Sequence, residues 1–267
     1  MSTTDLITGS TQSPQLLLRD TVALVTGASS GIGEATARSL SAEGAAVALV
    51  ARRRERLDQV AATISDDGGN ALVLEADLTD ADQATAAVTR AAGELGRLDI
   101  VVNNAGLLYP GPVAEAPQGE WERMIAINVN GVLNVTRAAL PNLIAAAARG
   151  PRYVADIVNI SSTGGRVARS GTAVYSLTKF GVNAFSESLR QELLANRVRV
   201  SLVEPGTVAT ELASHTREEL RAGIAQVTQS IELLRPEDIA EAIAYIVTRD
   251  RRVAVNEILI RAGDQTW

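Results

Sequence analysis

Seven short runs of apolar and β-branched residues alternate with longer stretches of helical periodicity along most of the chain. The runs that we expect to be strands are Val22–Thr26, Ala46–Val50, Ala71–Glu75, Ile100–Asn103, Ile157–Ser161, Val198–Val203 and Glu257–Ile260. The helical stretches are Gly31–Ala42, Arg53–Ser65, Asp80–Gly93, Trp121–Ala148, Val174–Ala195 and Pro236–Thr248. Strands that alternate with helices form βαβ units, so their sheet is parallel and covered on both faces. Right-handed crossovers then predict an α/β fold of three layers, with a doubly wound, seven-stranded parallel sheet.

Length and the character of the N-terminus indicate the domain organisation. The 267 residues suffice for one large domain with a substantial core. The first residues are rich in Ser and Thr and lack the basic segment of a secretory signal. We therefore expect residues 1–18 to be a flexible tail and residues 19–267 to form a single domain.

Composition excludes several classes of protein. The net charge of −6 argues against a nucleic-acid binder, because it implies no broad basic surface. The chain has no cysteine and one histidine, His215, which excludes disulfides, thiol catalysis and His-rich or thiolate metal sites. The longest apolar stretch, Ala138–Ala148, is interrupted by Pro141 and Asn142 and is too short to span a membrane. We expect a cytoplasmic protein that binds no metal, nucleic acid or membrane.

A glycine-rich segment, Thr26-Gly27-Ala28-Ser29-Ser30-Gly31-Ile32-Gly33, joins the first expected strand to the first expected helix. This context gives a glycine motif its meaning, because the backbone N–H groups can approach a pyrophosphate at the helix N-terminus. The spacing is G-x-x-x-G-x-G rather than G-x-G-x-x-G. A structural turn without a ligand is the alternative interpretation.

The residues after the second expected strand bear on which dinucleotide can bind. Dinucleotide folds that take NAD place an acid here, where it binds the ribose 2′-hydroxyl. This chain has Ala51 followed by Arg52 and Arg53, and a guanidinium can pair with a 2′-phosphate. We therefore expect NADP(H) to be preferred over NAD(H). A solvated basic helix start is the alternative, and it suits Arg54 and Arg56 better than Arg52.

Tyr175 and Lys179 are four residues apart on an expected helix and so share one face. A free tyrosine has a pKa of about 10. A nearby cation stabilises the phenolate and lowers that pKa. A proton donor beside a cation, together with a nucleotide cradle, suggests an enzyme that moves a hydride and a proton. A buried tyrosine and a surface lysine without chemical roles are the alternative.

Taken in order, these motifs resemble those of the short-chain dehydrogenase/reductase family, in its single-domain branch, from Leu18 to Gln265. The matching segments are Thr26–Gly33, Asp77-Leu78, Asn103-Asn104-Ala105-Gly106, Asn128, Ser162, Tyr175-x-x-x-Lys179 and Pro205-Gly206. The resemblance implies a Rossmann-type fold and an NADP(H)-dependent oxidoreductase. It would interconvert the carbonyl and alcohol forms of a small molecule, such as a secondary-metabolite aldehyde or a hydroxy acid.

The resemblance also implies catalytic roles for four residues. Tyr175 would be the acid/base, and Lys179 would lower its pKa and bind the nicotinamide ribose. Ser162 would orient the substrate oxygen, and Asn128 would hold a water that links Lys179 to solvent. Ser161 is the competing choice for Ser162, whose separation from Tyr175 fits the family better, and Asn130 is the competing choice for Asn128.

Cofactor contacts follow in the same way. The segment Asn104–Gly106 would pass the adenosine ribose, and Pro205–Thr210 would hold the nicotinamide carboxamide. Asp77 would accept from the adenine amine, or else be a helix N-cap or turn residue. The full set implied is Gly27, Ser29, Ser30, Gly31, Ile32, Gly33, Arg52, Arg53, Asp77, Leu78, Asn104, Ala105, Gly106, Tyr175, Lys179, Pro205, Gly206, Val208 and Thr210.

Two further segments narrow the resemblance. Phe180–Glu187 and Asn256–Gln265 are similar to NADP-dependent members such as clavulanic acid (clavaldehyde) dehydrogenase and the serine or 3-hydroxy-acid dehydrogenases. Substrate specificity is expected in Leu107–Pro112, Gly164–Ser170 and Glu211–Leu234, the last a helical lid that contains His215. In relatives, the helices matching Trp121–Ala148 and Val174–Ala195 form a dimer interface and the last strand joins a second one. A homotetramer, or a homodimer, is therefore expected.

Two other functions stay open at this point. The first is an epimerase or dehydratase that uses bound nicotinamide, although such enzymes usually carry an added substrate domain. The second is a non-catalytic NADP(H)-binding sensor or scaffold, although sensors of this fold often lose the Tyr or the Lys.

Overall fold

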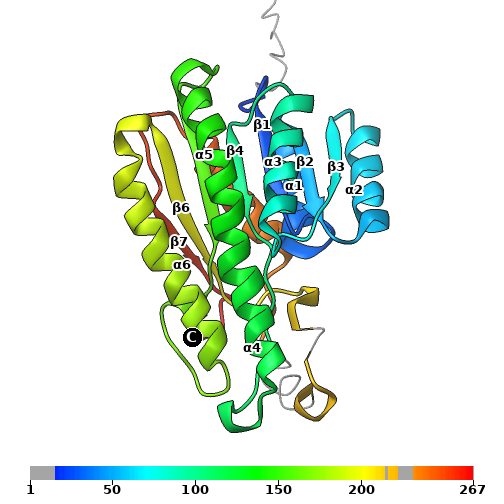
Figure 1. Cartoon of the computed structure of the whole chain (residues 1–267), viewed down its shortest axis with the longest axis vertical. Coiled ribbons are helices and arrows are strands. Elements are labelled where there is room, and N and C mark those ends of the chain that lie inside the picture. Colours follow the sequence, from blue (N-terminus) through cyan, green and yellow to red (C-terminus); the bar gives the residue numbers. More distant parts are fainter. Residues whose placement is uncertain (1–15, 214–215, 222–230, 267) are drawn as a thin grey trace, which may run out of the picture.

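The computed structural model describes residues 16–213, 216–221 and 231–266, which surround one central sheet (Figure 1). Its seven strands run in the order β3-β2-β1-β4-β5-β6-β7, and every neighbouring pair is parallel. The strands are β1 Val22–Thr26, β2 Ala46–Ala51, β3 Ala71–Glu75, β4 Ile100–Asn103, β5 Ala155–Ile160, β6 Val198–Pro205 and β7 Glu257–Ile260. The predicted Rossmann-type, doubly wound sheet is confirmed.

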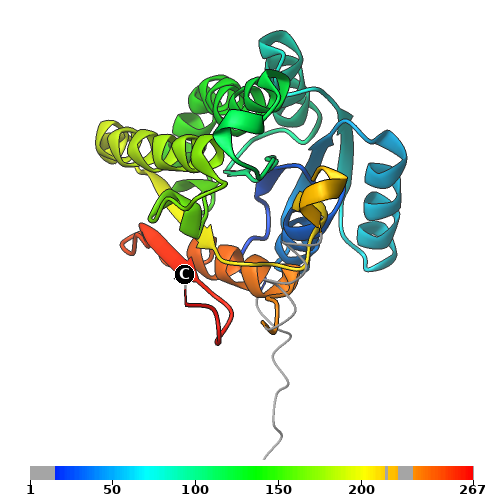
Figure 2. The same cartoon turned by 90° about the horizontal axis from the view of Figure 1, so that it is seen from below.

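Helices cover both faces of this sheet (Figure 2). They are α1 Gly31–Ala42, α2 Arg54–Asp66, α3 Ala81–Glu94, α4 Gln118–Ile125, α5 Val132–Arg149, α6 Ala173–Glu192 and α8 Pro236–Val247. Helices α3, α5 and α6 pack into one buried apolar cluster, and α1, α2 and α8 pack into another on the opposite face. Strands β1, β4, β5 and β6 are buried along their whole length, which agrees with the largely apolar sequences of β1 and β4.

One predicted helix differs in detail from the structure. The stretch Trp121–Ala148 is divided between α4 and α5, which are joined by a π-helical turn, Ala126–Gly131. Such a turn adds one residue to the helical repeat and often lies at a functional site. Apolar periodicity did not reveal it, and Pro141 lies inside α5 rather than ending the helix.

The chain ends and the lid are described only in part. Leu18, which we placed in the tail, is fully buried, and its N–H donates to the Glu43 carbonyl at 2.9 Å. Residues 1–15, His215 and most of the central part of the expected lid lie outside the described residues. Among the described helices, none combines the length and apolarity that a membrane crossing requires.

Candidate active site

Four chain segments that carry predicted site residues begin where strands end. The glycine-rich turn follows β1, Asn104–Gly106 follows β4, Ser161-Ser162 follows β5, and Gly206 follows β6. Because these strands are parallel, all four segments lie at one edge of the sheet, at the lower end of the molecule in Figure 1. This is where α/β sheets of this type bind ligands.

The glycine-rich turn brings α1 unusually close to the end of β1. A Cβ atom at Gly33 would lie 2.3 Å from the Gly27 carbonyl oxygen and 2.5 Å from Asn104 Nδ2, so only glycine fits there. Gly27 has a φ of +65°, which favours glycine. The Ser30 side chain caps none of the described N–H groups at the start of α1. Uncapped N–H groups at a helix N-terminus suit a pyrophosphate, so the turn fits a dinucleotide.

Thr26 joins this turn to the segment after β4. Its Oγ1 accepts hydrogen bonds from the N–H groups of Asn104 (2.9 Å) and Ala105 (3.0 Å). Asn104 Nδ2 donates in return to the Thr26 carbonyl at 2.9 Å. No separate role was predicted for Thr26, yet these hydrogen bonds of Thr26 hold two of the expected cofactor segments together.

Tyr175 and Lys179 lie on the first turns of α6 and are both almost fully buried. Lys179 Nζ donates to the Ile160 carbonyl at 2.7 Å and lies 5.7 Å from the centre of the Tyr175 ring. Tyr175 forms a hydrogen bond with Ser162. Ser161 points elsewhere, because its Oγ donates to Asn183 Oδ1 at 2.5 Å. The structure thus groups Tyr175, Lys179 and Ser162, and leaves Ser161 out.

Burial moves the pKa values of both groups. It raises the pKa of Tyr175, and the hydrogen bond from Ser162 only partly opposes this. We expected Lys179 to lower the pKa of Tyr175; the net shift is upward instead, because desolvation of the phenolate outweighs the hydrogen bond with Ser162. Burial lowers the pKa of Lys179 to about 8. Tyr175 is therefore protonated near neutrality and can donate a proton.

Asn128 lies in the π-helical turn and is 1% exposed. Its Oδ1 accepts from the Leu107 N–H at 2.9 Å, and its Nδ2 donates to the Leu107 carbonyl at 3.0 Å and to Thr178 Oγ1 at 3.2 Å. A Cβ atom at Gly106 would lie 3.2 Å from Asn128 Oδ1 and 3.8 Å from Lys179 Nζ. Asn128 therefore approaches Lys179 across Gly106, whereas Asn130 is exposed.

The arginines after β2 behave differently from one another. Arg53 Nη2 donates to Ser29 Oγ (3.0 Å) and Ser30 Oγ (2.7 Å), so its guanidinium lies against the glycine-rich turn. Arg52 is exposed and makes no hydrogen bond or ion pair with the rest of the described chain. Arg54 pairs with Asp58 one helical turn away. Of these arginines, Arg53 is the one positioned beside the expected cofactor segment.

Asp77 is a turn residue, which is one of the roles that the sequence left open for it. Its Oδ1 accepts from the N–H and the hydroxyl of Thr79, at 3.0 and 2.8 Å, and so closes a turn. The N-cap of α3 is Asp80 instead. Leu78 is buried directly after it, which fixes the turn at the edge of the sheet.

The segment after β6 is anchored at several points. The Thr207 N–H donates to Gln265 Oε1 at 2.9 Å, and Val208 forms a β-bridge with Leu234. A Cβ atom at Gly31 would lie 3.1 Å from Thr210 Cγ2, which places Thr210 against the glycine-rich turn. Pro205–Thr210 therefore borders the same edge as the other expected cofactor residues.

A buried carboxylate supports the serine and lysine segments from behind. Glu204, fully buried on β6, accepts from Arg166 Nε at 2.7 Å and from Asn183 Nδ2 at 2.8 Å. Arg166 follows Ser162 by four residues and also pairs with the half-exposed Glu257. This network was not predicted from the sequence, although an acid within the largely apolar strand β6 was a signal for it.

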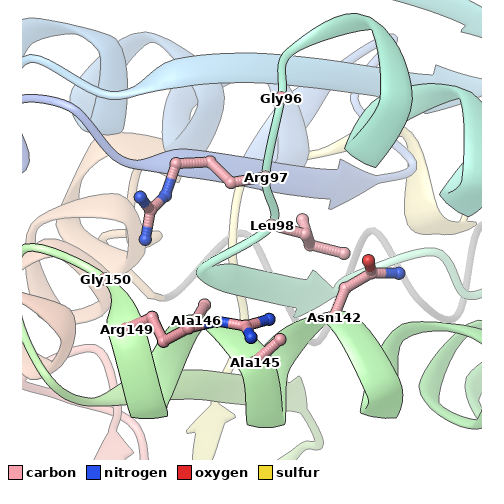
Figure 3. A pocket seen from close by; sticks show the side chains of 8 residues that line it. All are labelled: Gly96, Arg97, Leu98, Asn142, Ala145, Ala146, Arg149 and Gly150. Atoms are coloured by element: carbon pink, nitrogen blue, oxygen red, sulfur yellow. The ribbon is translucent and has the colours of Figure 1, made fainter.

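A separate cavity of about 260 Å³ lies at the opposite edge of the sheet (Figure 3). It is lined by the loop before β4 and by the end of α5, namely Gly96, Arg97, Leu98, Asn142, Ala145, Ala146, Arg149 and Gly150. Arg97 is held there by two bonds of 2.7 Å to the buried Asp99 carboxylate. None of the predicted site residues lines this cavity, so we place no chemistry in it.

Comparison with known proteins agrees with the geometry. The profile of the family described as short chain dehydrogenase matches residues 21–221. The chain is 38% identical over 246 residues to cis-4-hydroxycyclohexanecarboxylate dehydrogenase of Sinomonas cyclohexanicum, covering 92% of this chain and 96% of that protein. Among solved structures, it is similar to the closed form of serine dehydrogenase complexed with NADP+ (31% identity, TM-score 0.84, 92% and 96% covered).

A second solved structure bears on the cofactor. It is 3-ketoacyl-(acyl-carrier-protein) reductase from Brucella melitensis complexed with NADH (32% identity, TM-score 0.81, 92% and 98% covered). Similar proteins thus bind either dinucleotide. The chain belongs to the short-chain dehydrogenase/reductase family and is an NAD(P)-binding oxidoreductase that acts on a CH–OH group or the corresponding carbonyl.

Proposed function

We propose that this protein is an NADP(H)-dependent oxidoreductase that interconverts a small hydroxy acid or related alcohol and its carbonyl form. The observation that carries the proposal is the buried group of Tyr175, Ser162 and Lys179, with Asn128 across Gly106. The position of Arg53 against Ser29 and Ser30 supports NADP(H), because a guanidinium there can bind a 2′-phosphate. The hydroxy-carboxylate named for one relative supports the substrate class.

Each side chain of the group has a separate role in reduction of the carbonyl. The hydroxyl groups of Ser162 and Tyr175 hold the carbonyl oxygen, and Tyr175 donates its proton to that oxygen. When bound, NADPH supplies the hydride that the carbonyl carbon accepts. The Lys179 ammonium stabilises the resulting phenolate, and Asn128 and Lys179 lead a proton back from solvent. The cofactor residues already named, with Asn104–Gly106 and Pro205–Thr210, would hold the dinucleotide along the edge of the sheet.

Removal of one hydroxyl group tests the mechanism. We expect Tyr175→Phe to lower the turnover of NADPH with aldehydes, ketones and 3-keto acids by about 10³-fold. NADPH binding, followed by fluorescence, should not change. Tyr245→Phe is the matched control, because Tyr245 is half-exposed on α8 and stacks on Arg249. Turnover like that of wild type in Tyr175→Phe would refute the mechanism, and intact NADPH binding without any turnover in the wild type would favour a sensor.

Assembly into a homotetramer or homodimer is part of the proposal. Large apolar side chains are exposed on the two helices expected to pair, Leu133 on α5 and Leu177 and Phe180 on α6. Leu177 is 63% exposed, which is unusual for a leucine unless a partner covers it. Sedimentation at micromolar concentration should give a tetramer or a dimer, and a monomer would contradict this part.

A further inference from the structure

Arg53 has an internal anionic partner at the place where the proposed 2′-phosphate would bind. Its Nη1 donates to Glu211 Oε2 at 2.9 Å, across 158 residues of sequence. Arg56 Nη2 lies 3.8 Å from the other carboxylate oxygen, Oε1. Both members of the Arg53–Glu211 pair are about half exposed, with side chains 48% and 46% accessible. The contact is therefore open to solvent and to ligands.

The groups around the Glu211 carboxylate are those that bind phosphate in proteins. Arg53 and Arg56 supply guanidinium groups, and Ser30 supplies a hydrogen bond. Arg53, then the Ser30 hydroxyl and Arg56, hold the pKa of Glu211 below its usual range, so it is an anion at neutral pH. We call Arg53, Ser30 and Arg56 the Arg53 site.

The carboxylate is delivered by the segment that also borders the cofactor turn. Glu211 begins a short 3-10 turn directly after Thr210, which packs against Gly31. Further along the same segment, Arg217 lies 3.5 Å from Glu120 at the start of α4. The contact of Thr210 with Gly31 places the adjacent Glu211 beside the Arg53 site.

A 2′-phosphate and Glu211 cannot share Arg53 without a cost. Each of the three guanidinium nitrogens of Arg53 already has an acceptor, namely Ser29, Ser30 or Glu211. A phosphate dianion that enters beside the carboxylate would meet like charge at close range. Either Glu211 moves away or the phosphate binds more weakly.

We propose that Glu211 is a cofactor-selectivity residue, which occupies the Arg53 site as an internal competitor that the 2′-phosphate of NADP(H) must displace. The proposal rests on the proposed NADP(H) function. Competition lowers the apparent affinity for NADP(H) by the fraction of molecules in which the site is free. It leaves NAD(H) untouched, because NAD(H) carries no 2′-phosphate. Glu211 therefore reduces the preference for NADP(H) over NAD(H) that Arg53 creates.

Equilibrium binding of NADPH and NADH, measured by fluorescence at constant ionic strength, tests the competition. In Glu211→Gln the Kd of NADPH should fall roughly two- to fivefold, as expected for loss of an exposed ion pair. The Kd of NADH should stay within about twofold. Glu218→Gln is the charge-matched control, because Glu218 is exposed on the same segment and forms no ion pair with Arg53 in the described chain. Unchanged or weaker NADPH binding by Glu211→Gln would overturn the proposal.

Substitution of the arginines separates this proposal from the function on which it rests. Arg53→Gln should weaken NADPH binding by about tenfold or more and abolish the effect of Glu211→Gln in the double variant. If Arg53→Gln leaves the ratio of NADPH to NADH affinity unchanged while Arg52→Gln reduces it, Arg52 binds the phosphate and the competition proposal fails. If neither substitution changes that ratio, the proposed preference for NADP(H) itself is wrong.

Discussion

The two ends of the cofactor edge are built in contrasting ways. At the catalytic end, Tyr175, Lys179 and Asn128 are nearly inaccessible to solvent, and the backbone groups of Leu107 and Ile160 bind the polar atoms of Asn128 and Lys179. At the phosphate end, Arg53 and Glu211 are half exposed and are joined by a side-chain ion pair. The first arrangement fixes geometry and shifts pKa values, and the second can exchange one anion for another. In the proposed function, the reacting groups are thus held rigidly, whereas the choice of cofactor would depend on a contact of small net energy.

Substitution of Lys179 should have the largest effect on the reaction rate at the catalytic end. Lys179 is the only lysine among the 25 basic residues of the chain. Burial can lower the pKa of a lysine ammonium group until it loses its proton near neutral pH, whereas an arginine guanidinium stays charged. Lys179→Met should reduce the rate of carbonyl reduction by at least about 10²-fold, because the Tyr175 phenolate loses its stabilising charge. In the wild type, the rate should fall as pH rises through about 8, where Lys179 loses its proton. This decline should be absent from the residual rate of the variant.

The single lysine also makes the pKa directly measurable. Labelling with ¹⁵N-lysine gives one side-chain signal, which should titrate near pH 8 rather than near the ordinary value of 10.5. Between about pH 8 and pH 10.5, Lys179 is protonated in the unfolded chain but not in the folded one. The contribution of Lys179 to the free energy of unfolding therefore rises with pH in this range. Titration at the ordinary value would show that this end of the site is not desolvated as the geometry requires.

Substitution of Gly33 tests whether the glycine-rich turn beside Arg53 tolerates a side chain where α1 approaches β1. A Cβ atom there would lie 2.3 Å from the Gly27 carbonyl, so Gly33→Ala must push α1 away from the turn. We expect about a tenfold or larger loss of affinity for both NADPH and NADH, together with a lower melting temperature. Gly93→Ala is the control, because a Cβ atom at Gly93, in α3, has open space and should stabilise the helix slightly. Equal behaviour of the two variants would show that the close approach is unimportant.

Substitution of Glu204 tests whether a buried partner of Arg166 matters more for catalysis than an exposed one. Glu204→Gln keeps an acceptor for Asn183 but leaves the Arg166 guanidinium without its buried partner. We expect kcat to fall by about three- to tenfold, with the Kd of NADPH unchanged, because the segment after Ser162 loses a fixed position. Glu257→Gln removes the half-exposed partner of the same arginine and should change kcat by less than about twofold. Similar losses in both variants would contradict the assigned difference.

The sequence predicted the sheet, and the proximity of Tyr175 to Lys179, far better than the contacts of Arg53. Strands β1, β3, β4 and β7 have the expected bounds, because each is a short run of mostly apolar residues bounded by turn residues. The pairing of Tyr175 with Lys179 follows from helix periodicity, whereas the choice of Ser162 rested on the family resemblance. Sequence could not give the Arg53–Glu211 pair, because loop geometry brings together residues 158 positions apart. It also could not give the direction of the Tyr175 pKa shift, which depends on burial.

Ionic strength should produce the smallest effect and separates the two ends most simply. Salt screens charges that are exposed to solvent and affects buried groups much less. Raising monovalent salt from about 50 to about 200 mM should weaken NADPH binding by a few-fold through the exposed Arg53 site, and NADH binding by less. At saturating NADPH, kcat should change little, because Lys179 and Tyr175 are nearly inaccessible to solvent. In Glu211→Gln the salt dependence of NADPH binding should become steeper, because added salt no longer also weakens the competing carboxylate. A kcat that falls with salt as steeply as NADPH affinity would show that the catalytic end is open to solvent, and the contrast between the two ends would be lost.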